Sequence, residues 1–147
     1  MKYVNQLEHP HMLYTTHVED EGGRPSTIWS SGCGLCSAVM VADRLLPNCS
    51  FGLYDAIELS YSVEANHLIG TDYERFAPAF AEKMGFKLEM TSDPERLCHC
   101  LRTGGAAVAY VTGKVEMKHD VVALCSVQVM TEEIVTHAPG FYLFWRA

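Results

Sequence analysis

The chain has no cluster of basic side chains, and its 18 acidic residues outnumber 11 basic ones, for a formal charge of −7. A protein without a basic patch gains nothing from releasing the counterions of a phosphate backbone, so the composition argues against nucleic acid as a partner. The chain also lacks an apolar run of about 18 residues and an apolar signal segment after Met1, which argues against membrane insertion. We expect a cytoplasmic, non-exported protein.

Internal repeats, low-complexity tracts and Pro/Gly/Ser-rich linkers are also missing. With 147 residues, 48% of them hydrophobic, the chain is long enough to bury one core without a metal ion or a disulfide. We therefore predict a single domain over residues 1–147. Cysteine is not scarce, but without an export signal we expect reduced thiols. The six cysteines are Cys33, Cys36, Cys49, Cys98, Cys100 and Cys125.

The secondary-structure pattern changes along the chain. Apolar residues at helical spacing predict helices over residues 36–46, 50–61 and 72–84, with Ser50 capping the second and Gly85 ending the third. Strict alternation predicts a strand over residues 86–90, and Asp93-Pro94-Glu95 begins another helix. Helices followed by strands, without regular alternation, indicate an α+β fold. The later strands are expected at 106–112, 121–129, 134–136 and 141–145.

Residues 31–40, Ser-Gly-Cys-Gly-Leu-Cys-Ser-Ala-Val-Met, place two cysteines at the start of a predicted helix. Zinc binding would need a second pair of thiols, but Cys98 and Cys100 lie in a predicted helix, where residues two apart point about 200° from one another. A redox Cys-x-x-Cys motif typically follows a strand, and here a polar loop comes first. The pattern therefore disfavours metal and redox roles without removing them.

A nucleophilic thiol fits this position better. The start of a helix presents unpaired N–H groups and the positive end of the helix dipole, which favour a thiolate and can bind an oxyanion. Gly32 and Gly34 flank Cys33, which suggests a sharp turn that a substrate carbonyl can approach closely. The competing interpretation is that Cys33 is a small buried apolar residue.

The segment Gly32–Met40 resembles the nucleophile segment of papain-like cysteine peptidases of the bacteriocin-processing type, which cut after a double-glycine leader. Weaker similarity covers Val4-Asn5-Gln6 and residues 104–110. The resemblance implies a papain-like α+β fold, with N-terminal helices packed on a C-terminal antiparallel sheet. It also implies that Cys33 attacks an amide carbonyl. Papain itself would use the second cysteine of such a segment, so Cys36 is the alternative nucleophile.

The resemblance implies a histidine at the start of a late strand, and the best local match is His119 in Lys-His-Asp-Val-Val. The Asp-Pro that orients this ring in the family is Ala138-Pro139 here, and neither Glu132 nor Glu133 is marked as a replacement. Loss of the carboxylate predicts a weak enzyme. On another alignment the base-bearing segment is deleted at Thr112-Gly113, and His119 then has no role.

The family also uses a glutamine ahead of the nucleophile as an oxyanion donor, which implies this role for Gln6. Gln6 lies 27 residues before Cys33, so residues 9–27 must loop out to bring the two together. We predict a cysteine peptidase that acts on a peptide or protein and requires no cofactor and no metal. The alternative is a catalytically inactive papain-like module that binds a peptide or protein partner in the same cleft.

Overall fold

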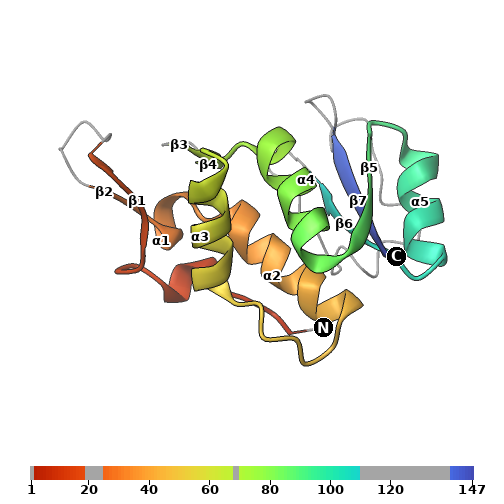
Figure 1. Ribbon diagram of the computed structural model, residues 1–147, viewed down its shortest axis with the longest axis horizontal. Helices are drawn as coiled ribbons and strands as arrows, with labels where there is room; N and C mark the ends of the chain where they lie inside the picture. The colour runs from red at the N-terminus through yellow and green to blue at the C-terminus, as the bar shows by residue number, and fades with distance from the viewer. Residues whose placement is uncertain (1, 19–24, 68–69, 110–139) are drawn as a thin grey trace. The chain divides into compact units, whose positions relative to one another are not determined.

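The computed structural model describes residues 2–18, 25–67, 70–109 and 140–147. The chain divides into two compact units, Met1–Glu82 and Lys83–Ala147. Figure 1 labels the helices and strands of both units. Both units combine helices with small antiparallel sheets, which confirms the predicted α+β class. A single domain remains a prediction. No helix in the described ranges is long and apolar enough to cross a membrane.

The first unit begins with a short 3-10 helix, η1 (Gln6–Glu8), and a hairpin that sequence analysis did not predict as strands. Strand β1 (Leu13–Val18) pairs antiparallel with β2 (Pro25–Thr27). The Ile28 amide then donates to the Met12 carbonyl at 2.8 Å, which closes the base of the hairpin. Strands β1 and β2 therefore lie within the stretch that was expected to loop out between Gln6 and Cys33.

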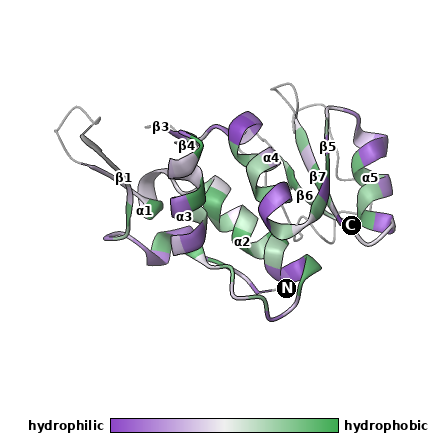
Figure 2. Ribbon diagram, viewed as in Figure 1, coloured by the Kyte–Doolittle hydropathy of each residue, from purple (hydrophilic) through white to green (hydrophobic). Residues whose placement is uncertain are grey.

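Helix α1 (Ile28–Ser31) leads through Gly32 into α2 (Cys33–Leu45). Sequence analysis missed α1 and placed the start of α2 three residues too late, because the apolar spacing is regular only from Cys36. The Gly32 amide donates to the Ile28 carbonyl at 2.9 Å, so one backbone turn joins the helices. Most of α2 is hydrophobic, as Figure 2 shows. Its buried residues are Leu35, Cys36, Ala38, Val39, Val41, Ala42 and Leu45.

Helix α3 (Leu53–Ser62) begins after Gly52 rather than after Ser50. The predicted cap is wrong because the Asp55 carboxylate accepts the Gly52 amide at 2.8 Å and fixes the first turn from inside the helix. Helix α3 contacts α2.

Two short strands, β3 (Asn66–His67) and β4 (Gly70–Thr71), then precede α4 (Tyr73–Met84). Helix α4 follows the predicted range and ends at Gly85, whose positive φ of 70° suits a residue without a side chain.

The second unit has a three-stranded antiparallel sheet in the order β5-β7-β6. Strand β5 (Phe86–Thr91), β6 (Ala106–Ala109) and β7 (Phe141–Arg146) all lie at predicted positions. Helix α5 (Pro94–Arg102) contacts β6 and β7, and its N-cap side chain, Asp93, accepts the Glu95 amide at 2.9 Å. The strands predicted over 121–129 and 134–136 lie outside the described residues. The core contains Leu97, Cys100, Leu101, Ala107, Phe141 and Leu143.

Candidate active site

Cys33 is the first residue of α2, and its side chain is exposed. The N-cap residue is Gly32, which has no side chain to cap the helix. No described residue accepts a hydrogen bond from the amides of Cys33, Gly34 or Leu35. The start of α2 therefore combines an exposed sulfur with N–H groups that have no acceptor in the described ranges, at the positive end of a 13-residue helix.

Cys36 lies three residues further along α2 and is only 3% exposed. Its amide donates to the Gly32 carbonyl at 3.0 Å, which holds it in the first turn of the helix. Burial, reinforced by the charge of the neighbouring Cys33, raises the pKa of the Cys36 thiol to about 11. A buried thiol that stays protonated at neutral pH is a poor nucleophile, so the fold favours Cys33 over Cys36.

The two glycines that flank Cys33 have a structural role that differs from the one expected. Neither has a positive φ. A Cβ on Gly32 would lie 2.7 Å from the Ile28 carbonyl oxygen, and one on Gly34 would lie 2.7 Å from Cε2 of Tyr73. Both distances are too short for a Cβ atom in van der Waals contact with its neighbour. Close packing of the first turn of α2 therefore requires both glycines, rather than a sharp backbone turn.

The short strand β4 and the start of α4 support the turn that carries Cys33. The Tyr73 hydroxyl donates to the Gly34 carbonyl, and the Thr71 Cβ lies 3.3 Å from the position of a Gly34 Cβ. The Thr71 hydroxyl is hydrogen-bonded to the buried Tyr14 hydroxyl at 3.0 Å. Sequence analysis missed Tyr73, because no local motif connects it to a glycine 39 residues away.

The structure brings Gln6 to the helix that precedes Cys33. The side-chain amide of Gln6 donates to the Trp29 carbonyl of α1 at 2.9 Å, across 23 residues of sequence. This bond uses one of its two N–H groups, and no described residue pairs with the other. Gln6 therefore lies beside α1 with one donor still available.

The predicted base lies outside the described residues, as do Ala138, Glu132, Glu133 and the Thr112-Gly113 junction. The role of His119 therefore stays a prediction. Among the described side chains, His67 on β3 is exposed and pairs with Gly70 in the register of β3 and β4. No imidazole in these parts of the chain is hydrogen-bonded to the Cys33 sulfur.

The other cysteine pair lies in α5. Cys98 and Cys100 are 2% and 0% exposed, and the Cys100 thiol approaches the carbonyls of Ala106 and Phe144 at 3.7 and 3.8 Å. Burial raises the pKa of the Cys100 thiol to about 12. Within the described ranges, no group of three or more His, Cys, Asp or Glu residues could hold a metal ion.

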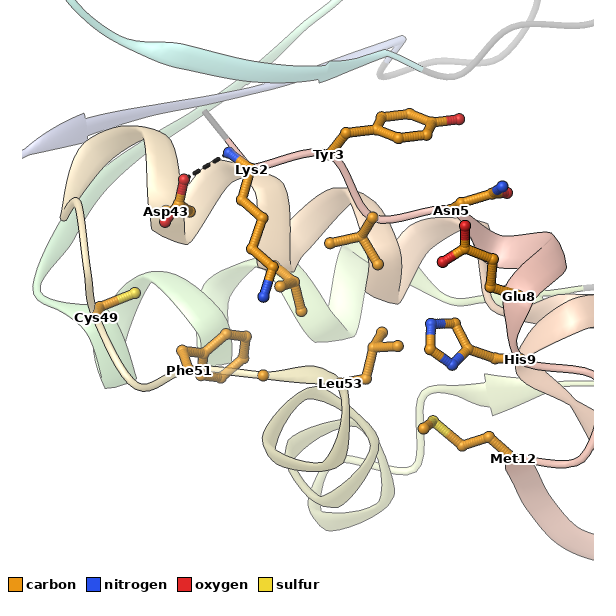
Figure 3. Close-up of a pocket in the computed structure, with 13 residues that line it drawn as sticks. Lys2, Tyr3, Asn5, Glu8, His9, Met12, Asp43, Cys49, Phe51 and Leu53 are labelled. Carbon is orange, nitrogen blue, oxygen red and sulfur yellow. Dashed lines mark hydrogen bonds between the residues drawn. The ribbon is translucent and has the colours of Figure 1, made fainter.

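A cavity of about 390 Å³ lies further along α2, at Val39 and Asp43 (Figure 3). The Lys2 amide donates to the Asp43 carboxylate at 2.6 Å, and the Lys2 side chain extends toward Phe51. Cys33 does not line this cavity, so the cavity is separate from the candidate active site. Its lining residues are Lys2, Tyr3, Val4, Asn5, Glu8, His9, Met12, Val39, Asp43, Cys49, Phe51, Gly52 and Leu53.

No family model matches the chain, and no curated protein or solved structure matches it either. Support for a function therefore comes from the geometry around Cys33 and from the resemblance of its sequence segment. The geometry distinguishes two thiols of one motif by their exposure, which the sequence segment alone left open.

Proposed function

We propose that the chain is a papain-like cysteine peptidase in which Cys33 attacks the carbonyl carbon of a peptide bond. The observation that carries this proposal is the exposed thiol at the start of α2, next to three backbone amides without an acceptor among the described residues. A tetrahedral intermediate on Cys33 places a negative oxygen within the reach of these amides. A helix start of this kind supports both the thiolate and the oxyanion.

In the proposed mechanism the Cys33 sulfur forms a bond to the carbonyl carbon while His119 takes the thiol proton. His119 then gives this proton to the leaving amine, the carbon–nitrogen bond breaks, and water hydrolyses the thioester. The Cys33 amide and the second N–H of Gln6 donate to the oxyanion. The substrate is a peptide or protein, and no cofactor takes part.

The proposed enzyme is weak because Ala138 stands where the family has the carboxylate that orients the histidine. An imidazole without this partner samples other orientations and tautomers, and the loss costs about 10⁴-fold in the best-studied serine triad. We therefore expect slow turnover, detectable by mass spectrometry after hours of incubation.

The test incubates the purified chain with a peptide mixture that includes sequences with a double glycine, and identifies cleaved products by mass spectrometry. Wild-type protein should produce new termini, and Cys33→Ser should produce none. His119→Ala should reduce the rate by about 10²-fold or more, whereas His67→Ala should leave it unchanged. If the wild type and Cys33→Ser give the same products, the proposal is wrong. If only His67→Ala loses activity, the assigned base is wrong.

The alternative is an inactive papain-like module that binds a peptide or protein. One observation favours it: the Gln6 amide already donates to the Trp29 carbonyl, a bond that directs the side chain toward α1. This alternative predicts that wild type and Cys33→Ser retain the same peptides with equal affinity and that neither cleaves them. Equilibrium binding measured on both proteins separates the two functions.

A further inference from the structure

The first turn of α2 contains two thiols in different surroundings. Cys33 is exposed to solvent, whereas Cys36, three residues later in the same turn, is 3% exposed. Both are free thiols in the structure. An oxidant in solution therefore reaches Cys33 more readily than Cys36.

The backbone geometry of a helix start brings the two residues within the range of a disulfide. Residues three apart on a helix have Cβ atoms about 5–6 Å apart, and a disulfide needs about 3.5–4.5 Å. Closing this gap needs a small shift in the first turn of α2, where Gly32 and Gly34 are closely packed and the Cys33 carbonyl accepts the Ser37 hydroxyl at 2.8 Å. Cys36 is held by burial and by the bond from its amide to the Gly32 carbonyl, while the Cys33 side chain is exposed and its amide has no acceptor among the described residues.

We propose that the Cys33–Cys36 pair is a site of reversible oxidation, in which a peroxide converts the two thiols into an intramolecular disulfide. The Cys33 thiolate attacks one oxygen of hydrogen peroxide, the O–O bond breaks, and hydroxide leaves and takes up a proton to form water. This step leaves a sulfenic acid on Cys33. Cys36 then attacks the Cys33 sulfur and gives its thiol proton to the departing hydroxide, so that the S–S bond forms, the S–O bond breaks and a second water leaves. The two thiols supply the two electrons that reduce the peroxide.

The electrostatics of the turn suit this division of roles. Burial and the charge of Cys33 keep the pKa of Cys36 high, at about 11, so this thiol does not compete for the oxidant at neutral pH. Cys36 therefore acts as the resolving thiol, and its attack on Cys33 is intramolecular.

The disulfide forms whether or not the chain is a peptidase, and only its effect on hydrolysis rests on the proposed function. If Cys33 is the nucleophile, the disulfide removes the attacking sulfur and blocks cleavage until a reducing thiol restores it. Without Cys36, the sulfenic acid would advance to sulfinic acid, which thiols do not reduce. The predicted benefit of Cys36 is recovery from oxidation.

The experiment treats the reduced full-length protein with one equivalent of hydrogen peroxide and measures intact mass, followed by peptide mapping without reduction. Wild type should lose about 2 Da, show a Cys33–Cys36 link, and regain its mass with dithiothreitol. Cys36→Ser should instead gain oxygen on Cys33 and form a dimedone adduct. Cys49→Ser, a matched control on another cysteine, should behave as wild type.

Two results would overturn the proposal. One is a wild-type protein that gains oxygen to the same extent as Cys36→Ser, and the other is a disulfide that maps to a different pair of cysteines. The wild-type map decides the question even if Cys36→Ser does not fold, and Cys36→Ala provides a second variant of the buried position. Because mass and mapping are independent of hydrolysis, a protein that cleaves no peptide can still confirm the disulfide.

Discussion

Helices α2 and α5 each contain two cysteines, yet the folded chain gives the two pairs different surroundings. In α2 a spacing of three at the helix start leaves Cys33 exposed and buries Cys36. In α5 a spacing of two in the middle of the helix buries both thiols. The comparison shows that position along the helix and burial, rather than the presence of paired cysteines, distinguish a candidate nucleophile from core residues.

The N-termini of the helices also differ, in whether a side chain caps them. The Asp93 carboxylate caps α5 by accepting the Glu95 amide, and the Thr27 hydroxyl caps α1 by accepting the Ser30 amide. The N-cap of α2 is a glycine, and no side chain among the described residues takes up its first amides. A side-chain cap at α2 would stabilise the helix but would occupy the donors that an oxyanion needs.

The largest expected effect comes from removing one thiol of each pair. Cys33→Ser should lower peptide hydrolysis by about 10³-fold or more, because a serine hydroxyl is far less ionised than a thiol at neutral pH. Cys98→Ala in α5 should change the rate by less than about twofold, because the proposed mechanism uses no residue of α5. Initial rates measured with the same peptide test this contrast. Equal losses in both variants would remove the distinction between the helices.

Much of the fold follows from local sequence signals. The helix from Asp93-Pro94 and the helix ending at Gly85 were predicted correctly because cap, proline and glycine act within a few residues. The start of α2 was predicted too late, because its first turn is specified by the distant residue Tyr73 rather than by apolar spacing. Local periodicity cannot reveal such a contact.

The candidate site was predictable only in part. The motif identified Cys33 and Cys36 together, but only burial in the folded chain separates them. The bond from Gln6 to Trp29 and the support from Thr71 and Tyr73 depend on tertiary packing, which no single-sequence pattern encodes. The role of His119 remains a prediction, since it lies outside the described residues.

A second prediction concerns the packing beneath Cys33. Gly34→Ala should destabilise the protein by about 1–3 kcal/mol, because the added methyl group would overlap the Tyr73 ring. Gly52→Ala is the matched control, because its nearest neighbour, an Asp55 oxygen, would lie 3.8 Å away. Urea denaturation of both variants tests the difference, and equal midpoints would contradict the packing role.

A third prediction uses the buried thiols at high pH. The pKa values of Cys36 and Cys100 are raised from 9.0 to about 11 and about 12, so the unfolded chain loses these protons before the folded one does. Their contribution to stability is complete below pH 9.0 and decreases as the pH rises toward these values, by up to about 1.4 kcal/mol per pH unit for each thiol. Between pH 8 and pH 10, the Tm of Cys100→Ala should decrease by roughly half as much as the Tm of wild type, because the variant removes one of the two thiols with a raised pKa. An identical decrease would show that Cys100 ionises normally.

The smallest expected effect is that of the Tyr73 hydroxyl. Tyr73→Phe keeps the ring that packs on Gly34 and removes only the donor to its carbonyl, which should cost about 0.5–1.5 kcal/mol. The same denaturation series measures it. A loss larger than that of Gly34→Ala would show that the hydrogen bond, rather than close packing, holds the first turn of α2.

The central claim is that the fold makes Cys33 the reactive thiol of this chain. The most direct measurement follows iodoacetamide labelling of each cysteine in the folded protein near neutral pH, with peptide mapping at successive times. The account predicts that Cys33 is labelled at least about tenfold faster than the other four thiols in the described ranges, with Cys36 and Cys100 the slowest. Equal labelling of all six thiols, or faster labelling of Cys36 than of Cys33, would contradict it.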